Sequence, residues 1–165
     1  MLLTALRALV LSVALCASVM ATDVGDIPHD ELGKLDGVVV KLSDSPGTVR
    51  IVSFWATWCA PCLRELPVLV QVQQQIGSDF LQVYAINYQE SRSKFERLVA
   101  QLDDSSVIYL RDRKGKTGRR FGVDGIPHTI LIGKDGRIAY QHIGYGTSTI
   151  DTMVEQINSL LQAEP

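Results

Sequence analysis

Cysteine and histidine are scarce in this sequence, and their scarcity limits the kinds of site that the chain can build. Three cysteines and three histidines occur among 165 residues. A structural zinc site usually takes four such ligands, and none here has the spacing of a zinc finger. Covalent haem attachment needs a histidine directly after a Cys-x-x-Cys pair, where this chain has Leu63. We therefore expect neither a bound metal nor a cofactor.

Dense basic runs, internal repeats and low-complexity segments are also missing from the chain. Its net charge is −2, whereas a nucleic-acid-binding domain usually carries a basic patch, so we expect no nucleic-acid partner. Apolar residues make up 46% of the sequence and charged residues 21%, which is typical of a globular protein. A chain of 165 residues suits one domain with a substantial core.

The N-terminal segment 1–21 differs from the rest in its apolar character. Arg7 precedes an apolar run over residues 8–20, which is shorter than the roughly 20 residues that a membrane span needs. The run ends in Val19-Met20-Ala21, a small-residue pattern suited to signal peptidase. We predict a secretory signal peptide over residues 1–21 that is cleaved after Ala21. An uncleaved membrane anchor is the alternative.

Cleavage would change the cysteine content of the mature protein. Cys16 lies in the segment removed, so Cys59 and Cys62 would be the only cysteines left. An exported protein works in an oxidising compartment, where a cysteine pair readily forms a disulfide.

Strand and helix patterns alternate along the remaining chain. Residues 22–36 are polar and are read as a loose lead-in to a domain over residues 37–165. Strands are expected over residues 37–44, 49–56, 80–88, 106–110, 128–133 and 137–144, and helices over 63–77, 91–102, 116–123 and 148–162. The last two strands are joined by a hairpin turn at residues 134–136. This order predicts an α/β sandwich whose sheet ends in a hairpin.

Cys59 and Cys62 stand where a buried strand ends and a helix begins, with Ala60 and Pro61 between them. A disulfide across so short a gap constrains little of the unfolded chain, so it suits a redox switch better than a staple. A helix N-terminus stabilises a thiolate at Cys59. Cys62, one turn later, is placed to attack a mixed disulfide on Cys59. The pattern predicts a redox-active pair in which Cys59 is the nucleophile and Cys62 the resolving thiol.

The motif "FWATWCAPC", Pro67 after it and the later "GIPHT" resemble the thioredoxin superfamily. More narrowly, residues 35–163 resemble its TlpA/ResA-like branch of exported thiol-disulfide oxidoreductases. The resemblance implies a thioredoxin fold: a central mixed β-sheet flanked by helices, with an N-terminal β-hairpin and a central βα insertion. It also implies a cis bond between Ile126 and Pro127, in a loop that faces the disulfide.

Two residues depart from the pattern of thioredoxin itself. Ser53 stands where thioredoxin has a buried acid, so the proton acceptor must come from elsewhere. Glu90 matches a glutamate that follows the third strand in the ResA-like branch, and desolvation there is expected to raise its pKa towards the working pH. The alternative for Glu90 is a solvated acid before a helix. The second departure is His128 after the cis proline, read either as a docking residue that binds a proton near neutral pH or as a partly exposed strand residue.

The two tryptophans have different expected roles. Trp55 fits the end of a buried strand and should pack in the core, whereas Trp58 should cover the disulfide as part of a docking surface. The residues expected to bind the substrate are Trp58, Ala60, Pro61, Ile126, Pro127 and His128.

The resemblance implies a periplasmic, monomeric protein-disulfide reductase. Its substrates would be protein disulfides of the kind met in cytochrome c maturation or copper-site assembly. Its electrons would come from a membrane thiol transporter of the DsbD/CcdA type. A copper(I) metallochaperone on the same fold is the alternative, because copper(I) favours thiolates and Cys59, Cys62 and His128 could supply three ligands.

Overall fold

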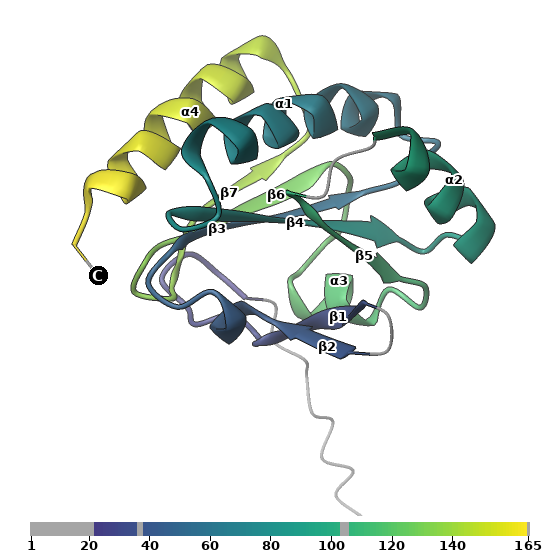
Figure 1. Cartoon of the computed structure of the whole chain (residues 1–165), viewed down its shortest axis with the longest axis horizontal. Helices are drawn as coiled ribbons and strands as arrows, with labels where there is room; N and C mark the ends of the chain where they lie inside the picture. The colour runs from purple at the N-terminus through teal and green to yellow at the C-terminus, as the bar shows by residue number, and fades with distance from the viewer. Residues whose placement is uncertain (1–21, 36–37, 103–105, 165) are drawn as a thin grey trace, which may run out of the picture.

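A five-stranded mixed sheet forms the centre of the protein (Figure 1). The computed structural model describes residues 22–35, 38–102 and 106–164, so the predicted signal peptide lies outside the described residues. The strands are β3 (Val49–Trp55), β4 (Leu81–Tyr88), β5 (Ile108–Asp112), β6 (His128–Ile132) and β7 (Ile138–Ile143), in the order β5-β4-β3-β6-β7. β3, β4 and β5 run parallel, whereas β6 and β7 are antiparallel to their neighbours. All seven residues of β3 are buried, as its nearly continuous apolar sequence requires.

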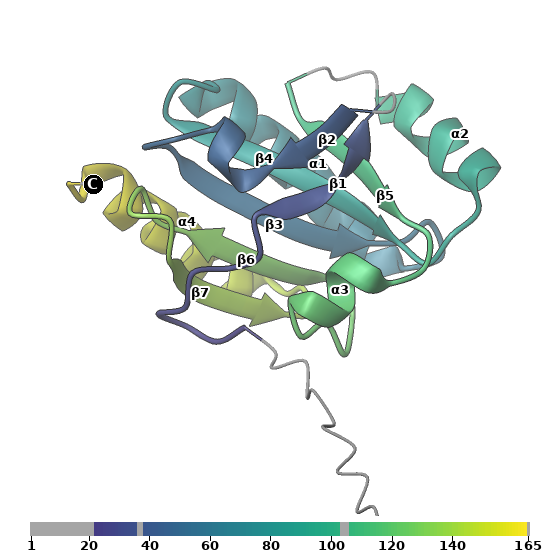
Figure 2. The ribbon, with the colours of Figure 1, turned by 90° about the horizontal axis from the view of Figure 1, so that it is seen from below.

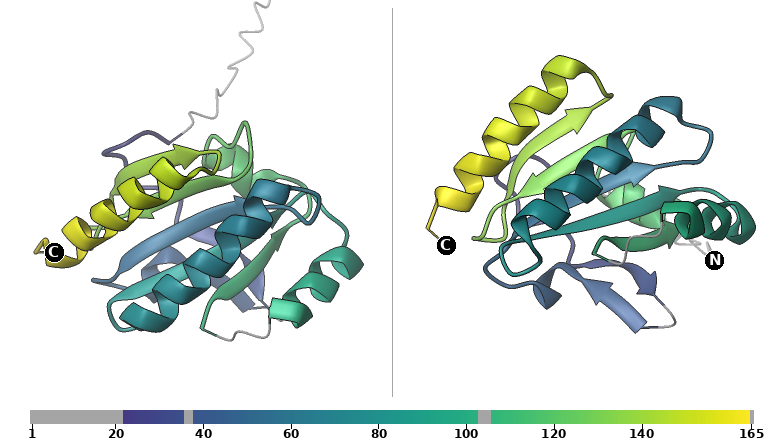
Figure 3. Two further views of the ribbon diagram at one scale, coloured as in Figure 1. Left: turned by 90° about the horizontal axis from the view of Figure 1, so that it is seen from above. Right: turned by 45° about the horizontal axis from the view of Figure 1, so that its top comes forward.

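Three helices cover one face of the sheet (Figure 3). They are α1 (Ala60–Ile76), α2 (Arg92–Leu102) and α4 (Thr147–Gln162). Leu66 and Leu69 of α1 and Met153 and Ile157 of α4 pack against the sheet with Trp55, because residues three and four apart share one side of a helix. α1 starts three residues before the helix expected from the sequence, since Pro61 is well suited to a first helical turn.

The opposite face carries α3 (Lys116–Arg120) and a separate two-stranded hairpin of β1 (Glu31–Leu35) and β2 (Val38–Lys41) (Figure 2). A short 3-10 helix, η1 (Leu42–Asp44), follows β2. Leu32, Leu42 and Phe121 pack there against Phe54 of β3. The N-terminal hairpin and the central insertion, here α2 and β5 between β4 and α3, are confirmed.

Residues 22–35 are more ordered than the polar composition of the predicted lead-in indicated. They contain β1, and Leu32 within β1 is only 1% exposed. Gly25 N donates to Ile138 O at 2.8 Å and Ile138 N donates to Asp26 O at 2.9 Å. This segment therefore adds hydrogen bonds to the edge of β7 and is part of the folded domain. None of the helices in the described part of the chain has the length and hydropathy of a membrane span.

Candidate active site

Cys59 and Cys62 form a disulfide at the start of α1. Cys59 is the N-cap residue of the helix, and its Sγ accepts a hydrogen bond from Cys62 N at 3.2 Å. A backbone N–H at a helix N-terminus favours negative charge on that sulfur. Cys59 is 5% exposed and Cys62 is fully buried. Of the two sulfurs, that of Cys59 is the one a partner reaches first.

The loop before β6 faces the disulfide. The Ile126-Pro127 peptide bond is cis, as the resemblance implied. Cys59 Sγ lies 3.7 Å from the carbonyl oxygen of Ile126. The carbonyl oxygen of Pro127 accepts a hydrogen bond from Gly144 N at 2.8 Å, which ties the loop to the end of β7.

Apolar side chains are exposed around the disulfide. Trp58, directly before Cys59, is 68% exposed. Trp55 is fully buried, as expected. Ala60 is exposed and Pro61 is half-buried in the first turn of α1. These side chains give the disulfide an apolar rim of the kind that protein partners cover.

Glu90 lies next to the loop that carries the cysteines, but its environment differs from the one expected. Its carboxylate accepts hydrogen bonds from Thr57 N and Thr57 Oγ1, both at 2.6 Å, and from Asn87 Nδ2 at 2.8 Å. Burial raises the pKa of Glu90, but these hydrogen bonds and the charge of Lys94 outweigh burial and hold the pKa below its ordinary value. The expected rise in the pKa of Glu90 is therefore wrong. Glu90 stays ionised, and its carboxylate holds Thr57 through two hydrogen bonds.

A second buried acid of the site is Glu65, which was not among the residues predicted from the sequence. Glu65 is 1% exposed and lies on α1, three residues after Cys62 and on the same side of the helix. Thr129 Oγ1 donates to Glu65 Oε1 at 2.8 Å, and Ser53 Oγ donates to Glu65 Oε2 at 3.4 Å. Burial raises the pKa of Glu65, and the two hydroxyl hydrogen bonds offset only part of the rise.

A sequence signal for Glu65 was present. Ser53 and Thr129 are hydroxyl residues within the apolar strands β3 and β6, where they are register partners. Buried hydroxyls need a hydrogen-bond partner, and a carboxylate on the helix above them can supply one. Ser53 stands at the position of thioredoxin's buried acid. Here it donates a hydrogen bond to Glu65, an acid that lies on α1.

The side chain of His128 lies away from the disulfide. It is 2% exposed and packs with its ring 6.5 Å from that of Phe54, whose core cluster is on the α3 side of the sheet. Its Nε2 lies 3.0 Å from Gln141 Oε1, and its Nδ1 is buried with no hydrogen-bond partner in the described part of the chain. Burial lowers the pKa of His128, although Gln141 and Asp124 act in the opposite direction. His128 is therefore neutral at pH 7, and it is neither partly exposed nor part of the rim.

This placement removes the third ligand of the copper alternative. The two cysteines belong to the core on the α1 side of the sheet, whereas His128 packs on the other side. Among the described residues, no three His, Cys, Asp or Glu side chains are grouped so that they could hold a metal ion.

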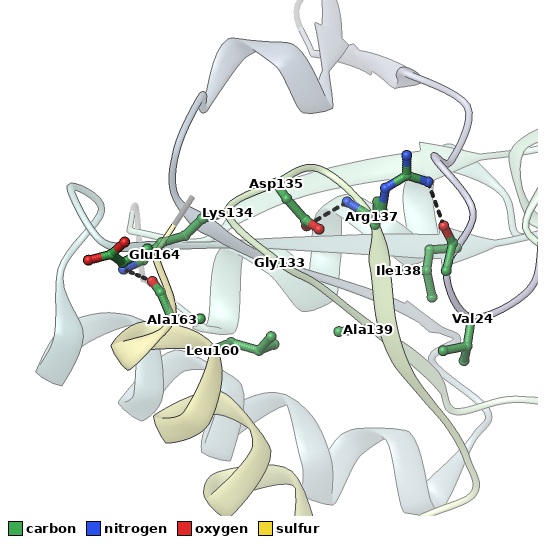
Figure 4. A pocket seen from close by; sticks show the side chains of 11 residues that line it. Val24, Gly133, Lys134, Asp135, Arg137, Ile138, Ala139, Leu160, Ala163 and Glu164 are labelled. Carbon is green, nitrogen blue, oxygen red and sulfur yellow. Dashed lines mark hydrogen bonds between the residues drawn. The ribbon is translucent and has the colours of Figure 1, made fainter.

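A hollow of about 260 Å³ lies at the far end of β6 from the disulfide (Figure 4). Its cations serve structural roles. Lys134 Nζ donates to the carbonyl oxygens of Leu161 and Ala163 at the end of α4, and Arg137 Nη1 donates to Gly25 O at 2.8 Å. These bonds fix Gly25 and the end of α4 to the hairpin between β6 and β7.

Thiol-disulfide oxidoreductase is the class of enzyme that this fold and this disulfide define. The chain belongs to the Redoxin family, whose model matches residues 23–161, and within the thioredoxin superfamily to its TlpA/ResA-like branch.

Individual relatives agree with this assignment. The chain is 28% identical to the thiol-disulfide oxidoreductase ResA of Geobacillus thermodenitrificans over 81% of its own length and 75% of that protein's. Its structure matches the protein assigned as thiol:disulfide interchange protein DsbE of Chlorobium tepidum with a TM-score of 0.78 and 33% identity, covering 86% and 99% of the two chains. The exposed lipoprotein thioredoxin Etrx1 of Streptococcus pneumoniae matches with a TM-score of 0.67 and 28% identity, covering 80% and 100%.

Proposed function

We propose that the protein is an exported reductase of protein disulfides, of the type that serves cytochrome c maturation or copper-site assembly. The observation that carries the proposal is the asymmetry of the pair: Cys59 caps a helix at the surface, whereas Cys62 is enclosed. A pair of this form can engage one partner through Cys59 and release it through Cys62.

The exchange proceeds in two steps. The Cys59 thiolate attacks one sulfur of the substrate disulfide, forms a mixed disulfide and releases the other substrate sulfur as a thiolate. The Cys62 thiolate then attacks the Cys59 sulfur, so the substrate leaves with both sulfurs reduced. Two electrons pass to the substrate, and the protein is left with the Cys59–Cys62 disulfide. A membrane dithiol transporter of the DsbD/CcdA type would reduce that disulfide again, and the enzyme would act as a monomer.

Resolution requires the buried Cys62 thiol to lose its proton, and Glu65 is our candidate for the acceptor. It lies one helical turn from Cys62, in the same core. Its raised pKa brings the carboxylate closer to the working pH, where general-base catalysis is most efficient. Glu90 acts instead as a positioning residue for the loop before Cys59, since its hydrogen bonds stabilise the ionised form.

Export is part of the proposal. The apolar segment 1–21 and its cleavage pattern support it, and so does the similarity to a lipoprotein described as exposed. Cleavage after Ala21 would leave Thr22 at the N-terminus of the mature protein, where its carbonyl oxygen accepts a hydrogen bond from Gln141 Nε2 at 2.9 Å.

The roles of the cysteines are tested by trapping. Reduced Cys62→Ser should accumulate a mixed disulfide with a disulfide-containing peptide, because nothing resolves the bond on Cys59. Cys59→Ser should accumulate none, since Cys62 is enclosed. Trapping through Cys62 would overturn the assignment of roles. The direction of flow is tested by the equilibrium potential of the wild-type pair: a value well below about −200 mV supports a reductase, whereas a value near that of DsbA, about −120 mV, would indicate an oxidase.

A further inference from the structure

The outward face of α2 forms a groove beside the active-site loop. Lys94, Arg97, Leu98 and Gln101 line it together with Thr57, and its volume is about 270 Å³. The four α2 residues have the spacing of a single helix face. Thr57 stands two residues before Cys59 in the chain. We call this feature the α2 groove.

The α2 groove is positively charged although the chain as a whole has a net charge of −2. α2 carries three cations and a single acid, Glu96. Arg92 Nε binds Glu96 Oε1 at 2.6 Å, so that acid is engaged at the outer side of the helix. Lys94 and Arg97 form no ion pair with another residue of the described chain, and both are exposed. Two cations that have no ion-pair partner among the described residues therefore stand in the groove.

The ionised carboxylate of Glu90 offsets one of these two charges, which leaves the groove with a net positive charge. Lys94 interacts with Glu90 through space, but the Glu90 oxygens already accept three hydrogen bonds from Thr57 and Asn87. An incoming carboxylate would thus meet N–H donors on Lys94, Arg97 and Gln101 that are still available to it.

The α2 groove is held in place relative to the disulfide. Phe95 packs against Trp55 with ring centroids 6.3 Å apart, and Trp55 ends the strand that leads into the cysteine loop. Half-buried Leu98 supplies an apolar lining beside the cations. A partner whose disulfide reaches Cys59 across the exposed Trp58 would extend naturally over this groove.

We propose that the α2 groove binds an acidic segment of the protein substrate, next to the disulfide that Cys59 attacks. The inference rests on the proposed function and adds to it a rule of selection: disulfides flanked by Asp or Glu are preferred. Charge complementarity of this kind acts mainly on the rate of encounter, so it should appear in the second-order rate constant and weaken as salt screens it.

The test compares two synthetic disulfide peptides that differ only in their flanking residues, Asp and Glu in one and Asn and Gln in the other. The quantity measured is the ratio of their second-order rate constants with the reduced protein at low ionic strength. In Lys94→Gln/Arg97→Gln this ratio should fall about three- to tenfold. In the control Lys34→Gln/Lys41→Gln, which removes two exposed charges from the β1–β2 hairpin on the other face, it should stay unchanged.

Using a ratio cancels the intrinsic reactivity of each peptide and any general loss of activity in a variant. An unchanged ratio in Lys94→Gln/Arg97→Gln would overturn the inference while leaving the oxidoreductase function intact. An equal fall in both double variants would show a non-specific effect of net charge and would overturn it as well. Failure of the wild-type protein to reduce either peptide would instead remove the proposed function, and this inference with it.

Discussion

Glu90 and Glu65 show how two carboxylates near one disulfide acquire opposite properties from their hydrogen-bond partners. Glu90 accepts two short hydrogen bonds from Thr57 and one from Asn87, and its pKa is lowered. Glu65 has only hydroxyl donors in a fully enclosed position, and its pKa is raised. Ionised Glu90 is suited to holding a loop, whereas Glu65 is suited to exchanging a proton.

Replacing Glu90 by glutamine should therefore disturb the loop, not the proton chemistry. The glutamine oxygen can still accept from Thr57 N and Asn87 Nδ2, and its amide can donate to Thr57 Oγ1, but the charge that strengthens these hydrogen bonds is lost, at a cost of about 1–3 kcal/mol of unfolding free energy. Disulfide exchange should slow because Thr57 positions the loop before Cys59. The shape of the pH-rate profile between pH 5 and 9 should match wild type, as measured by stopped-flow kinetics. A displaced profile would restore Glu90 to the role of a base.

Replacing Glu65 by glutamine should have the opposite signature. The amide keeps the size and an acceptor for Thr129 but cannot take a proton, so resolution by Cys62 should slow by about a hundredfold, at the lower end of general-base contributions. The first step, attack by Cys59, should change little, and quenched-flow trapping of the mixed disulfide separates the two steps. Glu96→Gln, on the exposed surface of α2, is the matched control. Equal rates of resolution in wild type and Glu65→Gln would exclude Glu65 as the acceptor.

At the level of single residues, the sequence predicted the Cys59–Cys62 disulfide and the cis bond before Pro127. Cys59, Cys62 and Pro127 belong to motifs in which spacing and chain position carry the chemistry. Glu65 belongs to no such motif. It is a buried acid because β3 and β6 bring Ser53 and Thr129 beneath it. The pairing of neighbouring strands in a mixed sheet cannot be predicted from periodicity alone. The burial of His128 depends in the same way on which face of β6 it occupies.

At the level of elements, strand and helix types were predicted well because their apolar periods are clear. The β1–β2 hairpin was expected from the resemblance, yet its first strand falls in the segment that composition described as a loose lead-in. Polar residues dominate that segment, but buried Leu32 anchors β1 to the core with Phe54 and Phe121. The apolar residues of the segment do not alternate with polar ones at a period of two, so the pattern is too weak for a strand to be recognised.

The hairpin should therefore contribute to the stability of the whole domain. Leu32→Ala removes a side chain that is 1% exposed and should lower the unfolding free energy by about 2–5 kcal/mol, as measured by urea denaturation. Val38→Ala, in the adjacent strand and 70% exposed, should change it by less than about 0.5 kcal/mol. Similar small effects of both substitutions would mean that β1 is attached to the domain without supporting it.

At the scale of the whole molecule, buried ionisable groups make folding stability depend on pH. Some of them reduce stability as the pH rises, and others reduce it as the pH falls. The raised pKa of Glu65 means that its contribution is present below its ordinary pKa of about 4.3 and is lost as the pH rises through its folded value. The lowered pKa of Glu90 means that its contribution is present above that ordinary value and is lost in more acidic solution. His128, with a lowered pKa, makes a contribution that is lost as the pH falls below its ordinary pKa of about 6.5.

Because the folded state keeps His128 neutral, its contribution to stability is present above the unfolded pKa of about 6.5 and is lost as the pH falls through the folded value. Protonation would place a second N–H at Nδ1, which is buried without a partner. His128→Gln keeps a donor for Gln141 and cannot titrate. We expect wild type to lose stability relative to this variant as the pH falls from 7.5 to 5, in urea denaturation followed at several pH values. Glu65 is present in both proteins, so its opposing effect cancels from the difference. A difference in unfolding free energy that does not change with pH would show that His128 accepts its proton in the folded protein as readily as in the unfolded chain.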